Sequence, residues 1–375
     1  MTTPLGLETK AQRCIFVTYI GLWVSYGMLS ELAKRQGVHF NSACAVVLQS
    51  LLKLLLATYM YMTTETITTS SLAARIRFML AQVRTHARLI LFYIIPSGLY
   101  VVYDVLSYIN LRAFDASTYF LLMQFRLVVT GVLHQLMFSK RLNRNQWLSL
   151  GVITIGCTIK TLSTQDTDGS ARFGVNYNGP RPVAYLLLLT QILSGTFAGV
   201  YNEVLLKKQV AITVNLQNVF MYFNSIIGTM IMLGMGMTGQ TAQDALTISN
   251  FSELFSPYVL PMVLIMSFTG IVTSLFLKQL DSIRKAIASA MELVFLPLLC
   301  AVLFGQLITL YTMAAIVFVG FGVYLYALPV KVLSTAELPK YRKVTHQEMV
   351  QDENDSLDTP IDVAESPSAV NRLRC

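Results

Sequence analysis

Ten apolar stretches follow one another along the chain, and short polar segments separate them. Each is long enough for a helix to cross the hydrocarbon core of a bilayer, which takes about 17–25 residues. Apolar and polar residues do not alternate over any sustained run, as they would in half-buried strands, so the pattern predicts helices throughout. The predicted spans are residues 14–30, 42–62, 89–107, 114–138, 147–163, 182–206, 215–238, 256–277, 285–304 and 308–330.

The amino-acid composition favours the same class of protein. Of the 375 residues, 54% are hydrophobic and only 13% are charged, and the mean hydropathy is +0.57. A soluble domain usually has about 45–50% apolar and about 25% charged residues. The composition excludes an ordinary soluble enzyme and a disordered scaffold. We predict an all-α, polytopic membrane protein with a cytosolic N-terminus (residues 1–13), a ten-helix domain (residues 14–330) and a disordered cytosolic tail (residues 331–375).

Lysine and arginine are unevenly distributed between the loops. Twenty of the 28 lie in the termini and the even-numbered loops or at their edges, five lie in the odd-numbered loops, and three lie inside spans. Positive residues accumulate on the cytoplasmic side of membrane proteins, so we predict that both termini are cytosolic. This bias accounts for most of the net charge of +8, which therefore does not indicate binding to nucleic acid. The glycosylation sequon at Asn250 falls in a loop that this topology places in the lumen.

The even number of spans suggests two repeated halves. When the chain is aligned on itself at an offset of 166 residues, six identical residues coincide, among them Gly156 and Gly322. The fourth and fifth spans then overlie the ninth and tenth, as a five-plus-five inverted repeat requires. We predict that arrangement, although six identities among mostly apolar positions can also arise by chance.

Ionisable side chains inside membrane spans are costly and often functional. Those in or at the edge of the spans are Lys53, Asp104, Arg126, Glu203, Lys285 and Glu292. Arg126 and Lys285 are the strongest candidates, because a guanidinium and an ammonium group facing one cavity would suit a diphosphate. Tyr119 precedes Arg126 by two helical turns, which predicts that the two share a face. The alternative is that these residues form ion pairs that hold the helices together.

Polar residues also gather on the seventh span. Asn218, Tyr222 and Ser225 share one helical face, whereas Asn224 falls off that face in an ideal helix. An amide and a phenol could bind and stack on a nucleobase. Hydrogen bonds between membrane helices explain the same residues equally well.

Close helix packing is the expected role of Gly195 and Gly199, which form a small-xxx-small pattern. The sequence contains no HExxH, GxSxG or P-loop motif, its four histidines are dispersed, and its five cysteines form no CxxC pair. We therefore expect no catalytic residues, no metal site and no cofactor, and predict that the protein is not an enzyme.

Several motifs resemble those of the nucleotide-sugar transporters, a family of the drug/metabolite transporter superfamily. The likeness is to the branch that carries CMP-sialic acid, UDP-galactose and UDP-N-acetylglucosamine, and it covers roughly residues 45–330. The motifs are FDASTYFLLMQFRLVVTGVL, RLNRNQWLSLGVITIGCTI, FAGVYNEVLLKK, LQNVFMY, LKQLDSIRKAIASAMELVFLPLLCAVLFGQLIT and VYLYALP.

This resemblance implies roles for individual residues. It places phosphate binding at Arg126, Lys285 and Tyr119, nucleoside recognition at Asn218, Tyr222 and Asn224, and the lysine of the second helix at Lys53. Asp104 and Glu203 are further expected cavity residues. The chain departs from the family where Arg126 replaces a usual lysine, Asn224 a usual serine and Asp104 a usual asparagine. The positive charge of the phosphate site is retained, whereas sugar and base specificity do not transfer with it.

The function that the resemblance implies is antiport by alternating access in the Golgi membrane, with the endoplasmic reticulum as the alternative. A UDP-sugar, UDP-galactose before UDP-N-acetylglucosamine, would enter the lumen in exchange for UMP. The implied partners are the UDP-sugar, UMP and the lipid bilayer; homo-oligomers and complexes with glycosyltransferases of the luminal pathway stay open. Two alternatives are a permease of the same superfamily for another organic anion or metabolite, and a non-transporting membrane scaffold.

Overall fold

A computed structural model describes residues 5, 7–38, 40–64, 71–114, 119, 122–138, 141–163, 182–209, 211–236, 241–305 and 307–328. All structural statements below concern these residues, which leave out the predicted tail. They form helices and no strands. The helices are α1 (Lys10–Arg35), α2 (Ser42–Thr64), α3 (Leu72–Thr85), α4 (Ala87–Ala113), α6 (Arg126–Phe138), α7 (Arg144–Ser163), α8 (Pro182–Lys208), α9 (Val214–Gly234), α10 (Ala242–Ala245), α11 (Ile248–Glu253), α12 (Val259–Gln279), α13 (Ser282–Phe304) and α14 (Leu310–Ala327).

Eight described helices are long and apolar enough to cross a membrane: α1, α2, α4, α8, α9, α12, α13 and α14. The other two predicted spans correspond to α7, which is not among the eight, and to the shorter apolar helix α6 of 13 residues. The described part of the predicted span 114–138 contains a turn at Gln124 and Phe125, directly before α6. Large apolar side chains such as Leu186 and Val302 are exposed on these helices, as expected for surfaces that face lipid.

Local capping sets the start of α13, the helix that carries Lys285. The Asp281 carboxylate accepts a hydrogen bond of 2.7 Å from the backbone N–H of Arg284, a typical N-cap. The helix therefore begins at Ser282, before the predicted residue 285, and Lys285 lies one turn inside it. At the other end Gly305 adopts the left-handed conformation (φ 62°), which ends the helix.

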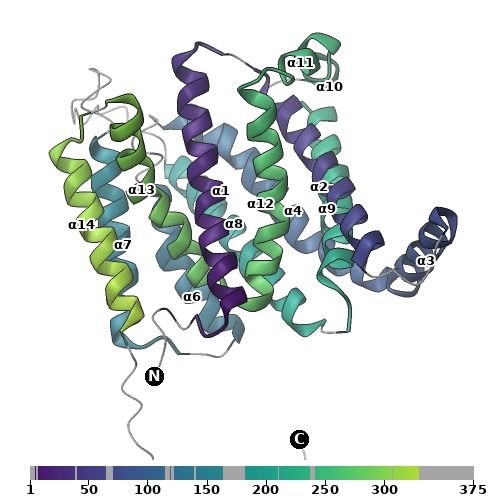
Figure 1. Cartoon of the computed structure of the whole chain (residues 1–375), viewed down its shortest axis with the longest axis horizontal. Coiled ribbons are helices and arrows are strands. Elements are labelled where there is room, and N and C mark those ends of the chain that lie inside the picture. The colour runs from purple at the N-terminus through teal and green to yellow at the C-terminus, as the bar shows by residue number, and fades with distance from the viewer. Residues whose placement is uncertain are drawn as a thin grey trace, which may run out of the picture. The chain divides into compact units, whose positions relative to one another are not determined.

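Helices far apart in the sequence pack in pairs. α14 lies along α7, α4 contacts both α8 and α9, α1 contacts α12 and α13, and α2 contacts α9 and α12. Figure 1 shows α7 beside α14 at one side of the helices, whereas α3 lies at the opposite side. The sequence pattern did not predict α3, which falls in the second loop and is too polar to span.

Two glycines make reciprocal contacts between α7 and α14. A Cβ on Gly156 would lie 2.9 Å from Cγ2 of Val319, and a Cβ on Gly322 would lie 2.5 Å from Cγ1 of Ile153. Both distances are too short for a real Cβ, so each glycine permits close approach of the helices. At the offset of 166 residues Gly156 aligns with Gly322, and Ile153 aligns with Val319. The contact of Gly156 with Val319 therefore corresponds to the contact of Gly322 with Ile153, with the roles of α7 and α14 exchanged.

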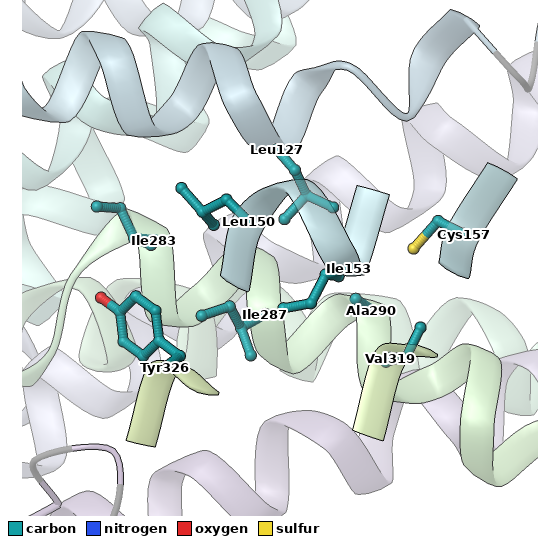
Figure 2. Packing of buried hydrophobic residues seen from close by; sticks show 9 residues of the cluster. All are labelled: Leu127, Leu150, Ile153, Cys157, Ile283, Ile287, Ala290, Val319 and Tyr326. Carbon is teal, nitrogen blue, oxygen red and sulfur yellow. The ribbon is translucent and has the colours of Figure 1, made fainter. Parts of the chain in front are cut away.

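One hydrophobic cluster joins α6, α7, α13 and α14 (Figure 2). Leu127, Ile283 and Ile287 are almost fully buried in it. Leu127 is adjacent in sequence to Arg126, and the two isoleucines flank Lys285 on α13. Packing of this cluster therefore fixes the backbone from which the side chains of Arg126 and Lys285, two of the three predicted phosphate-binding residues, project.

Candidate functional site

A cavity of about 330 Å³ lies between α4, α6, α7, α8 and α13. Arg126 and Lys285 both line it, so the structure brings together the two cations that the sequence singled out. Arg126 is the first residue of α6 and is exposed, whereas Lys285 is half-buried. Among the described residues, neither charged group has a hydrogen-bond or ion-pair partner. Each lies within electrostatic range of a carboxylate, Arg126 of Glu292 and Lys285 of Glu203, so the alternative of structural ion pairs stays open.

The cavity wall opposite Lys285 contains Gly199 of α8, which has no side chain to fill the space. A Cβ on Gly199 would lie 4.0 Å from Nζ of Lys285 and 3.7 Å from the hydroxyl of Tyr100, which is ordinary contact. Gly195 differs, because its Cβ would lie 2.6 Å from the ring of Tyr103. Gly195 thus serves the close packing of α8 on α4 that the pattern predicted, and both glycines line the cavity.

Some lining residues were predicted from the sequence and others were missed. Lys285 and Glu292, both candidates from the sequence, follow each other at i and i+7 on α13 and line the cavity. Ser289, at i+4 between them, also lines the cavity and was not predicted, although the same spacing identifies it. From α4, Tyr100 and Tyr103 add aromatic faces with polar ends.

Tyr119 does not line this cavity. It is buried, and its hydroxyl accepts a hydrogen bond of 2.7 Å from Nε2 of Gln191 and lies 3.1 Å from Oγ of Ser107. Oε1 of Gln191 in turn accepts a hydrogen bond of 2.8 Å from Asn110. The turn before α6 also removes the expected two-turn helical spacing from Tyr119 to Arg126. The structure places Tyr119 in a buried polar network between α4 and α8.

The predicted nucleoside-binding residues lie on α9, away from this lining. Asn218 is buried, and its Nδ2 has no hydrogen-bond partner among the described residues. Nδ2 of Asn224 donates a hydrogen bond of 2.8 Å to the backbone oxygen of Ile90 on α4. Asn224 therefore joins two helices, in agreement with its position off the shared face.

Lys53 and Tyr222 converge on Gly270 of α12. A Cβ on Gly270 would lie 2.9 Å from both Cε of Lys53 and the hydroxyl of Tyr222, so only glycine leaves room for both. Asp104 attracts Lys53 electrostatically and lines a second pocket of about 140 Å³ between α2, α4 and α9. Tyr100, which lines the larger cavity, is within electrostatic range of Tyr222 and Asp104.

Glu203 lies in a buried hydrogen-bond network that links helices. Its side chain is fully buried, and its carboxylate accepts hydrogen bonds from Lys207 (2.6 Å) and from the backbone N–H and hydroxyl of Ser282 (2.7 and 2.5 Å). Nε2 of His134 lies 3.6 Å away. A carboxylate at the N-terminus of α13 is also stabilised by the helix dipole. Glu203 therefore ties α6, α8 and α13 together and does not line the cavity, in contrast to its predicted place there.

Comparisons with known proteins agree on one family. Residues 11–327 match the family model described as "Nucleotide-sugar transporter". The chain is 31% identical over 347 residues to "UDP-galactose transporter senju" of Drosophila melanogaster, covering 85% of this chain and 86% of that protein. It is 29% identical to "UDP-galactose translocator" of Bos taurus (68% and 63% covered) and 25% identical to "CMP-sialic acid transporter 2" of Oryza sativa subsp. indica (63% of each).

A solved crystal structure shares the fold. It aligns with a TM-score of 0.58 at 10% sequence identity and covers 85% of this chain and 96% of its own. The arrangement of helices is therefore one already seen in an experimental structure.

Proposed function

The chain belongs to the nucleotide-sugar transporter family, and we propose that it imports a UDP-sugar into the Golgi lumen in exchange for UMP. UDP-galactose is the substrate we favour, and UDP-N-acetylglucosamine is the second. The fruit-fly and bovine relatives, which are named for UDP-galactose, support this choice.

The pair of unpaired cations in one cavity is the observation that carries the proposal. A diphosphate brings about two negative charges, and a buried charge without a partner costs several kcal/mol. Arg126 can bind phosphate oxygens with its planar fork, and Lys285 offers a compact charge. The cavity of about 330 Å³ is at the lower end of the range of small-molecule sites, about 300–1,000 Å³.

Exchange follows from what the two ligands share. UMP contains the nucleoside and one phosphate of a UDP-sugar, so it can occupy the same nucleoside and phosphate contacts after the sugar has been transferred in the lumen. We assign the nucleoside to the region of Asn218 and Tyr222 on α9. The unpartnered Nδ2 of Asn218 supports this assignment, because a buried amide without a partner is rare.

Alternating access would use two halves of five spans each, with α6 and α7 as the fourth and fifth spans. The contacts between helices support this division. If each span is replaced by the equivalent span of the other half, five positions away, one observed helix pair becomes another observed pair. The contact of α1 with α12 corresponds to that of α4 with α8, and the contact of α2 with α12 to that of α4 with α9. The reciprocal contacts of Gly156 and Gly322 follow the same exchange.

Uptake into liposomes tests the proposal directly. Purified protein in vesicles preloaded with UMP should take up labelled UDP-galactose, and empty vesicles should take up much less. Uptake of another organic anion without exchange for UMP would favour the permease alternative. Absence of any uptake by folded protein would favour a non-transporting scaffold.

A further inference from the structure

Glu292 is a negative charge in a cavity that otherwise presents two positive charges. It lies on α13 two turns beyond Lys285 and is half-buried. At 1.5 Å per residue this separates the two side chains by about 10 Å along the helix axis. On its far side α1 comes close, because a Cβ on Gly27 would lie 3.0 Å from Oε1 of Glu292. The carboxylate therefore stands at the part of the cavity nearest α1.

The carboxylate of Glu292 accepts no hydrogen bond and forms no ion pair within 4 Å among the described residues. Glu203 shows the opposite case, because its carboxylate accepts three hydrogen bonds inside the protein. An ionised carboxylate has about four acceptor sites. Arg126 attracts the carboxylate electrostatically, and within the described part of the chain its acceptor sites are open to donors on a ligand.

The position of Glu292 indicates which part of a nucleotide sugar it meets, given the proposed function on which this inference rests. The proposed nucleoside region around Tyr222 lies where Lys53 of α2 and Tyr222 of α9 approach Gly270 of α12, among residues that do not line the cavity next to Glu292. The phosphates belong with Arg126 and Lys285. The space next to Glu292 and α1 is then left for the sugar, whose hydroxyl groups are hydrogen-bond donors.

We propose that Glu292 determines sugar specificity: it accepts hydrogen bonds from a neutral, hydroxyl-bearing sugar and excludes a sugar that carries a carboxylate. Arg126 and Lys285 match the two charges of the diphosphate. A third negative charge, on the sugar, would lie beside the Glu292 carboxylate, and like charges repel strongly where water is scarce. Selection by repulsion in this way is a common source of specificity.

UDP-galactose and UDP-galacturonic acid are a matched pair for the test, because they differ only at C6, where a hydroxymethyl group is replaced by a carboxylate. Each is used to compete with labelled UDP-galactose for uptake into UMP-loaded liposomes. For the unmodified protein we expect UDP-galacturonic acid to compete at least tenfold more weakly, which corresponds to about 1.4 kcal/mol. Glu292→Gln, which keeps the shape and removes the charge, should reduce this ratio to less than about threefold.

Two further variants complete the test. Glu292→Asp keeps the charge and should keep the discrimination, and Glu253→Gln removes the same charge from an exposed position on α11 and should leave the ratio unchanged. Equal competition by both sugars in the unmodified protein, or an unchanged ratio in Glu292→Gln, overturns the proposal. If Glu292→Gln does not fold, the competition ratios of the unmodified protein and of Glu292→Asp test the proposal. In both proteins UDP-galacturonic acid should compete more weakly than UDP-galactose. Failure of the unmodified protein to bind UMP or UDP-galactose would instead reject the proposed function.

Discussion

Removal of Lys285 tests the proposed phosphate site most directly. Its ammonium group has no partner among the described residues, so Lys285→Ala leaves no protein group there newly unpaired. The folded protein should therefore keep its stability and reach the membrane normally. A hydrogen bond to a charged group contributes about 1.5–3 kcal/mol, and about 1.4 kcal/mol is a factor of ten. Affinity for UMP should fall roughly tenfold to more than a hundredfold.

Arg126 should behave in parallel, with one informative difference. Arg126→Ala should abolish exchange, whereas Arg126→Lys should retain much of it, because lysine keeps the charge and loses only the planar fork. Lys160 provides the matched control. It is a lysine on α7 whose Nζ donates a hydrogen bond of 2.9 Å to Oγ1 of Thr312, and it does not line the cavity. Lys160→Met should lower thermal stability and leave UMP affinity unchanged.

Calorimetry or thermal-shift titration with UMP measures these affinities on purified variants, beside uptake into liposomes. The reasoning is refuted if Lys285→Ala and Arg126→Ala fold normally and bind UMP as tightly as the unmodified protein. Misfolding of both variants would instead assign these residues to the packing of the helices.

Four further substitutions and one topology experiment test other parts of the argument. Tyr222→Ala should weaken uptake of every substrate with the same nucleobase; loss of one UDP-sugar but not another would place Tyr222 at the sugar instead. Gly195→Ala should lower stability by about 1–3 kcal/mol because its Cβ would meet Tyr103 at 2.6 Å, whereas Gly199→Ala should fold normally; thermal unfolding separates the two. Glu203→Ala should destabilise the protein by about 1–3 kcal/mol, since it leaves the buried N–H of Ser282 unpaired while Lys207 keeps its hydrogen bond to the backbone oxygen of Leu280, and normal expression and melting would contradict this. In sealed microsomes a tag inserted near Gln240 should be protected from protease and one after Cys375 cleaved, and a protected C-terminal tag would overturn the predicted topology.

The sequence predicted the class of fold and most helix positions because both depend on long apolar runs. It placed the ends of helices less well where a single side chain decides them. Asp281 starts α13 three residues early, and the turn at Gln124 and Phe125 precedes α6 within a stretch that is apolar enough to read as one helix. Neither event changes the average hydropathy of the segment.

The candidate site was predictable in part for a related reason. Charge inside an apolar span pointed to Arg126 and Lys285, and the structure brings both to one cavity. The same criterion also selected Glu203, which is fully paired, because the sequence does not show which helices come together around a charge. Tyr119 and Asn224 have the polar groups expected of ligand contacts, yet their partners Gln191 and Ile90 are distant in sequence and are seen only in the folded chain.

The junction at Glu203 has a mechanical consequence. The Glu203 carboxylate contacts His134 of α6, Lys207 of α8 and Ser282 of α13. These parts of the three helices can separate only if the contacts to this buried carboxylate break, so we expect them to move together. Pro297, farther along α13, has no N–H to give to the carbonyl of Leu293, and proline is the usual place where a helix bends. On α13 the cavity residues Lys285, Ser289 and Glu292 lie between the junction at Glu203 and Pro297. A bend at Pro297 would then move the end of α13 that carries Phe304, which lies under the guanidinium of Arg35 on α1, while Lys285 stays next to the junction at Glu203.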